Sequence, residues 1–72
     1  MSAPAPKPYV TARAAAERLG VPIETVIADV ERGMRGELDA LTGGPVGGFY
    51  IVEAWELDGE RIEMHRRRLG CS

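Results

Sequence analysis

The 72-residue sequence has one cysteine, one histidine, few aromatic residues and no long apolar run. Because Cys71 is the only cysteine, no disulfide can form within one chain, and with only His65 beside it a Cys/His metal cage is not expected. We therefore expect no metal and no cofactor. A membrane-spanning helix needs roughly 20 apolar residues, so we expect no membrane association. A chain this short buries only about 60% of its unfolded surface, which favours self-association, and we expect a homodimer.

The sequence also lacks a signal-like N-terminus and an excess of positive charge. Residues 1–8 form an arm rich in proline and alanine, which we interpret as disordered or extended. Since no basic segment precedes an apolar one, we expect a cytoplasmic protein. The formal net charge is −2, and residues 36–65 hold seven acidic side chains against one basic side chain, Arg61. This is not the broadly basic composition that makes nucleic-acid binding a simple inference.

Two short helices are predicted between Thr11 and Gly33. Thr11 is a favourable N-cap for a run of strong helix formers, and Gly20 supplies the left-handed geometry that ends a helix. A second helix is predicted from Pro22 to about Arg32, where Gly33 ends it. Its apolar residues recur at i, i+3, i+4 and i+7, as Ile23, Val26, Ile27 and Val30. Two helices joined by three or four residues that include a glycine form a helix-turn-helix unit.

The chain after Gly33 gives weaker signals. Residues 34–42 fit either a short helix or a strand, and residues 43–48, which are rich in glycine, predict a flexible loop. Asp58-Gly59 is a strong signal for a two-residue hairpin turn, so residues 49–57 and 60–67 are predicted to be paired strands.

The predicted hairpin has one apolar face, on which we expect core packing or the homodimer contact: Phe49, Ile51, Trp55, Leu57, Ile62 and Met64. The alternative is a helix that uses the heptad spacing of Trp55, Ile62 and Leu69. That helix places Gly59 in its interior, at a cost of about 1 kcal/mol relative to alanine. The fold class expected on the hairpin interpretation is α+β, with an N-terminal helix-turn-helix followed by a C-terminal β-hairpin. Residues 9–69 would form this single winged-helix-like domain.

The first third of the chain carries a recognisable pattern. An aromatic residue and a threonine come first, then two alanines, a Leu-Gly-Val turn, a Thr-Val pair and a closing glycine, here Tyr9, Thr11, Ala15, Ala16, Leu19, Gly20, Val21, Thr25, Val26 and Gly33. This pattern resembles the start of excisionase/MerR-like winged helix-turn-helix domains. In that family a hairpin wing follows, and then a helix that often opens with a Leu-Glu-Ala-Trp-like run. Residues 52–55, Val-Glu-Ala-Trp, are similar to that run, although they follow the expected wing strand at residues 49–51 closely.

The resemblance implies a small DNA-binding regulatory protein, either a transcriptional regulator or an excisionase-like protein of a bacterium or phage. Its second helix would lie in the major groove. The candidate DNA-contacting residues are cations near the two helices or at the C-terminus, and one threonine: Arg13, Arg18, Thr25, Arg32, Arg35, Arg66, Arg67 and Arg68. Glu24, Asp29 and Glu31 are expected on the exposed side of the same helix, where they would face a polyanion.

The acidic side chains leave a second function open. A protein-interaction module, or an accessory protein of a phage or mobile element, would use this acidic surface to bind a basic protein partner. An enzyme is not expected, because the carboxylates are scattered and His65 has no partner acid at a motif spacing. We therefore interpret His65 as a surface histidine.

Overall fold

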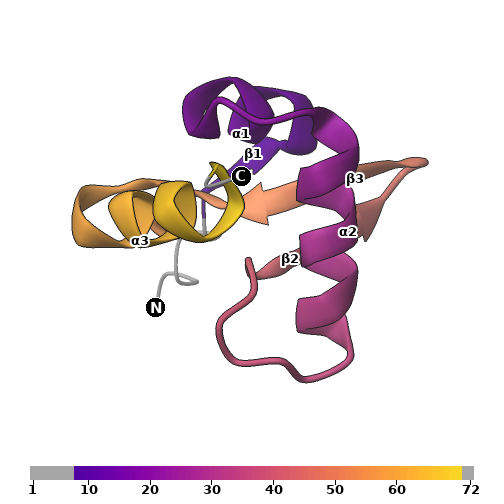
Figure 1. The fold of residues 1–72 in the computed structure, drawn as a ribbon. Coiled ribbons are helices and arrows are strands. Elements are labelled where there is room, and N and C mark those ends of the chain that lie inside the picture. The colour runs from indigo at the N-terminus through magenta and orange to yellow at the C-terminus, as the bar shows by residue number, and fades with distance from the viewer. Residues whose placement is uncertain (1–7, 71–72) are drawn as a thin grey trace, which may run out of the picture.

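The computed structural model describes residues 8–70, which form an α+β fold with a three-stranded antiparallel sheet. The elements in chain order are β1 (Tyr9–Thr11), α1 (Ala12–Leu19), α2 (Ile23–Met34), β2 (Gly43–Val46), β3 (Phe49–Glu53), the 3-10 helix η1 (Ala54–Leu57) and α3 (Gly59–Gly70). The strand order is β1-β3-β2. Figure 1 shows α1 across one end of α2, with α3 on one side of α2 and the β2–β3 hairpin on the other. The predicted arm falls outside the described residues, apart from Pro8.

The two predicted N-terminal helices are confirmed. The Thr11 hydroxyl accepts a hydrogen bond from the amide of Ala14 at 3.1 Å, and Gly20, with φ 72°, follows the last residue of α1. The apolar faces of both helices enter one core with residues from the loop, β3 and η1: Ala12, Ala15, Ala16, Leu19, Val26, Val30, Leu41, Val52 and Leu57. The local capping and periodicity signals therefore describe α1 and the apolar face of α2 correctly.

The C-terminal end of α2 differs from the prediction. Gly33 does not end the helix, which continues to Met34. The residue that ends it is Gly36, whose φ of 99° is the positive value that glycine adopts without strain. The amide of Glu37 donates to the carbonyl of Arg32 and the amide of Gly36 to that of Gly33, which is the Schellman pattern of helix termination.

Gly33 has a different role, in the packing of α2 against the following loop. A Cβ at this position would lie 2.7 Å from the carbonyl oxygen of Leu41, so only glycine allows this close approach. Residues 37–42, for which helix and strand were both open, are neither. They form a loop that returns the chain from α2 to β2.

The structure contains a hairpin, but at another place than predicted. Residues 43–48 are not a flexible loop, because β2 pairs with β3 from Gly43↔Val52 to Val46↔Phe49. The turn between the strands is Gly47-Gly48, with φ values of 57° and 90°. Positive φ at both central residues is what a type I′ hairpin turn requires. The hairpin therefore precedes the last helix, and the element order is β-α-α-β-β-α.

The predicted pairing of residues 49–57 with residues 60–67 is wrong, because the second segment belongs to α3. The carbonyl of Asp58 accepts hydrogen bonds from the amides of Arg61 and Ile62, so Asp58-Gly59 opens a helix and does not form a turn. The helical alternative is closer to the structure, although Gly59 begins the helix and does not interrupt it.

The apolar face expected on the C-terminal hairpin is consequently divided among β3, η1 and α3. Leu57 is buried, but the Trp55 side chain is 48% exposed, stacked on the guanidinium of Arg61 at 5.0 Å. A homodimer through that face loses its structural basis, while the homodimer itself stays a prediction.

Candidate nucleic-acid interface

The surface of α2 that points away from the core carries one stripe that continues onto the residue after the helix. Its residues occur at i, i+4, i+7 and i+11, and all are exposed: Glu24, Ala28, Glu31 and Arg35. A helix that enters a major groove presents such a stripe to the base edges. Two acids and one cation give this stripe a net charge of −1.

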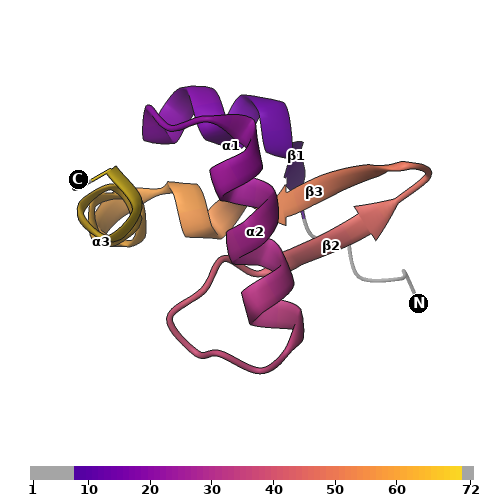
Figure 2. The ribbon, with the colours of Figure 1, turned by 45° about the vertical axis from the view of Figure 1, so that its right-hand side comes forward.

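One side of the stripe faces the β2–β3 hairpin across an open groove of about 600 Å³, which we call the wing groove. It is lined by the start of α1, by α2 and by the hairpin tip, with mostly apolar side chains and one cation: Thr11, Ala12, Arg13, Ile23, Ile27, Gly48, Phe49 and Tyr50. Figure 2 shows the hairpin projecting from α2 on the side away from α3. The Tyr50 hydroxyl donates to Glu31 at 2.9 Å, and this hydrogen bond raises the pKa of Tyr50.

The other side of α2 is closed by charged contacts with α3. Asp29, which was expected on the surface, is only 2% exposed. Its two oxygens accept hydrogen bonds from both terminal nitrogens of Arg68, at 2.8 and 2.9 Å, and one oxygen accepts from Arg32 at 3.1 Å. The amide of Leu41 donates to Asp29 at 2.8 Å. Burial would raise the pKa of Asp29, but the hydrogen bonds from Arg68 and Leu41 and the charges of both arginines together lower it.

Glu56 in η1 is a second buried carboxylate, and its side chain is fully enclosed. One oxygen accepts from Nε2 of His65 at 2.8 Å and from Arg61 at 2.7 Å, and the other accepts from the amide and the hydroxyl of Thr42 at 3.0 and 2.7 Å. Burial would raise the pKa of Glu56, but the hydrogen bonds from His65, Thr42 and Arg61 together lower it. Glu56 thus joins η1, α3 and the loop before β2.

His65 connects the two buried carboxylates, so its prediction as a surface histidine is wrong. Its Nδ1 lies 2.6 Å from a terminal nitrogen of Arg68. Because a guanidinium group can only donate, Nδ1 is the acceptor, and the ring proton sits on Nε2 and points to Glu56. We call Asp29, Glu56, His65 and Arg68 the buried charge network. Sequence reasoning missed it because the two carboxylates lie on α2 and η1, and no local spacing relates them to His65 and Arg68 on α3.

Three of the predicted DNA-contacting arginines are engaged by hydrogen bonds and ion pairs with other parts of the fold. Arg68 belongs to the buried charge network, and Arg32 pairs with Asp29, Glu37 and Asp39. Arg66 donates two hydrogen bonds to the carbonyl of Arg18, at 3.0 and 3.2 Å, and thereby caps the C-terminal end of α1. These three side chains stabilise the fold, and DNA would have to compete with their partners.

The other predicted contact residues keep open side chains. Within residues 8–70, four arginines have no salt bridge: Arg13, Arg18, Arg35 and Arg67. Arg13 lines the wing groove, and Arg67 lies on the exposed face of α3 beside Glu60 and Glu63. Thr25 is half-buried in a shallow depression between α2 and the end of α3. The structure therefore does not gather the eight candidates into one surface.

Within residues 8–70 no cluster of three or more His, Cys, Asp or Glu side chains is placed to hold a metal ion. None of the helices in this part of the chain has the length and apolar character needed to cross a bilayer. No family model, curated protein or solved structure matches the chain. The geometry of α2 and its surroundings is thus the basis for a functional proposal.

Proposed function

We propose that the protein is a small DNA-binding regulatory protein of the winged-helix type. The observation that carries this proposal is the position of the β2–β3 hairpin beside α2, on the side that α3 leaves open (Figure 2). A helix-turn-helix unit places its second helix in the major groove. A hairpin beside that helix is where winged helix-turn-helix domains have their wing. Residues 52–55, the run that is similar to the family's, span the end of β3 and the start of η1, and η1 leads into α3 in the order that the family resemblance implies.

The cations around α2 suit contacts with phosphates on the two sides of a groove. Arg13 lies in the wing groove together with Ile23, the first residue of α2, and Arg35 follows the last residue. The 12 residues of α2 span about 18 Å. The major groove is about 12 Å wide, so the two arginines lie near the two ends of a helix that bridges it.

The acidic side chains of the stripe limit the affinity that one copy can reach. Glu31 is engaged by Tyr50, and Glu24 can accept a hydrogen bond from the amino group of a cytosine. With few phosphate contacts, we expect weak binding that is clearest at about 50 mM salt and weakens as salt displaces the contacts.

The test is fluorescence anisotropy with random-sequence duplex DNA, followed by duplexes selected from that pool. Arg13→Ala and Arg35→Ala should each weaken binding and reduce the slope of log K against log salt by about 1. Arg67→Ala is the matched control, because the acidic neighbours of Arg67 disfavour a phosphate contact. Absence of binding by folded protein at about 50 mM salt, or an equal loss in the control, would contradict the proposal.

A second candidate function, binding of a basic protein partner, is favoured by the wing groove itself. Phe49 is 54% exposed at the hairpin tip, and Glu24 and Glu31 are exposed on the neighbouring stripe. Such a surface suits an apolar side chain flanked by lysine or arginine. This candidate differs from the first in one measurable respect, since its complex survives treatment with nuclease.

A further inference from the structure

The loop between α2 and β2 exposes a leucine almost completely. Leu38 is 96% exposed, and Met34, at the end of α2, is 57% exposed. The loop that carries Leu38 is nevertheless held in place on both sides of it. Arg32 pairs with Glu37 at 2.7 Å and with Asp39 at 3.5 Å. An isolated exposed leucine is ordinary, but a leucine held out by an anchored loop at the edge of a pocket indicates a contact surface.

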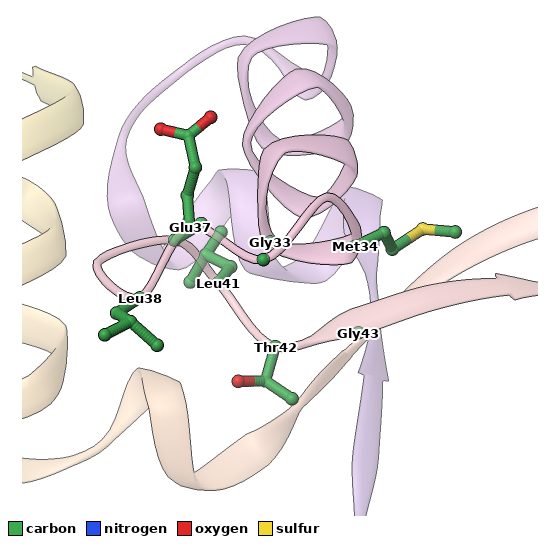
Figure 3. A pocket seen from close by; sticks show the side chains of 9 residues that line it. Gly33, Met34, Glu37, Leu38, Leu41, Thr42 and Gly43 are labelled. Carbon is green, nitrogen blue, oxygen red and sulfur yellow. The ribbon is translucent and has the colours of Figure 1, made fainter.

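A small pocket of about 240 Å³, which we call the loop pocket, has Leu38 and Met34 at its edge, among its lining residues. Three of its lining positions are glycines, Gly33, Gly36 and Gly43, and the others include Ala40 and Leu41. Figure 3 shows Met34 and Leu38 extending in different directions from this glycine-lined segment. A buried apolar cavity of roughly 150 Å³ admits benzene. The loop pocket therefore has room for the four carbons of a leucine side chain.

We propose that this surface binds a second copy of the chain, with Leu38 of each copy entering the loop pocket of the other. A projecting side chain and a pocket that are neighbours on one surface are self-complementary, so a two-fold axis between them forms both contacts at once. Each loop pocket is then filled only when the other copy supplies its leucine.

The charges around the loop pocket agree with a symmetric contact. Two cations and two acids lie within a few residues of Leu38 and cancel: Arg32, Arg35, Glu37 and Asp39. Two copies can thus approach each other without net electrostatic repulsion. A strongly basic or acidic partner would instead be attracted by a surface of opposite net charge. The contact lies at the C-terminal end of α2, so it leaves the wing groove and the N-terminal end of α2 accessible.

Sedimentation equilibrium of the full chain over about a hundredfold range of concentration tests this inference. A thiol reductant is present, so that Cys71 cannot crosslink two copies. The wild-type mass should rise from 7.8 kDa toward twice that value as concentration increases. Leu38→Glu should weaken association at least about tenfold, and Leu38→Met should preserve it. Since Leu38 is 96% exposed, both variants should keep the circular dichroism spectrum of the wild type.

Phe49→Glu is the matched control, because Phe49 is also apolar and half exposed but lies at the hairpin tip. It should associate like the wild type. A wild-type chain that stays at 7.8 kDa throughout, or a Leu38→Glu variant that associates normally, would overturn the inference. Loss of association in the Phe49→Glu control would overturn it too, by moving the contact to the hairpin. The samples contain no DNA, so the outcome is independent of the DNA-binding test.

Discussion

The two flanks of α2 make opposite kinds of contact. Toward α3, Asp29 is buried and binds Arg68 through two hydrogen bonds, and His65 continues the contact to Glu56. Toward the hairpin, α2 presents isoleucines to the wing groove, and the exposed Tyr50–Glu31 hydrogen bond spans the gap. One flank is charged and closed, and the other is apolar and open.

This difference shows why a count of charged residues is a poor guide to what a small protein binds. Arg32, Arg66 and Arg68 add to the basic residues of the sequence, but their guanidinium groups are already used by Asp29 and by the carbonyl of Arg18. Of the arginines without a salt bridge, Arg13 lies on the open flank, Arg35 follows the end of α2, and Arg67 lies on α3.

The largest expected loss of stability comes from removing a buried carboxylate on the closed flank. Asp29→Ala leaves Arg68 without its carboxylate and the amide of Leu41 without its acceptor. Removal of one partner from a buried ion pair costs about 3–5 kcal/mol of unfolding free energy. Urea unfolding followed by circular dichroism measures this loss. In contrast, Glu24→Ala, which removes an exposed carboxylate from the same helix, should leave the midpoint unchanged.

A loss for Asp29→Ala below about 1 kcal/mol would mean that the closed flank contributes no more than an ordinary surface contact. The distinction between the two flanks would then rest on shape alone.

Acid should weaken the closed flank in the unmodified protein. The pKa values of Asp29 and Glu56 lie below their usual values of 3.8 and 4.5, so both remain ionised in the folded protein at a pH that protonates them in the unfolded chain. Their contribution is full above pH 4.5 and is lost as the pH falls through the lowered pKa values. The melting temperature should fall steadily below pH 4.5, and less steeply in Asp29→Asn. A melting temperature that is constant from about pH 5 to about pH 3 would refute this.

The smallest effect is expected on the open flank. Tyr50→Phe removes the hydroxyl that bonds Glu31 and keeps the aromatic ring that packs against the core. Because Glu31 is exposed, water replaces the lost hydrogen bond, and the melting temperature should change by less than about 2 °C. A larger decrease, measured by differential scanning calorimetry, would show that the hairpin depends on this contact for its position.

The sequence predicted the helix-turn-helix unit because the signals there are local. Thr11 caps the helix that follows it at once, Gly20 ends that helix, and the apolar stripe of α2 lies within eight residues. Each signal acts over one or two helical turns, which is the range that pattern reasoning covers. The roles of the candidate DNA-contacting arginines were harder to predict, because the partner of an arginine side chain depends on the complete fold.

The C-terminal half was mispredicted because the sequence has two dipeptides that suit a two-residue hairpin turn. Asp58-Gly59 and Gly47-Gly48 both allow a tight hairpin, and the choice depends on which strands find partners. β3 pairs with β2 on one edge and with β1, about forty residues earlier, on the other. No local pattern shows the second pairing. The buried positions of Glu56 and His65 follow from the same long-range packing, and they were equally hidden.

The long-range ties of α1 have a consequence for the order of events during synthesis. A helix of eight residues does not persist alone in water, and α1 is held at one end by the pairing of Val10 with Val52 and at the other by Arg66. The ribosome makes α1 and α2 before either of these ties exists. The helix-turn-helix unit is therefore completed only after α3 has been made. A chain that terminates before Arg66 would lack one of these two ties and should be cleaved by proteases faster than the full chain.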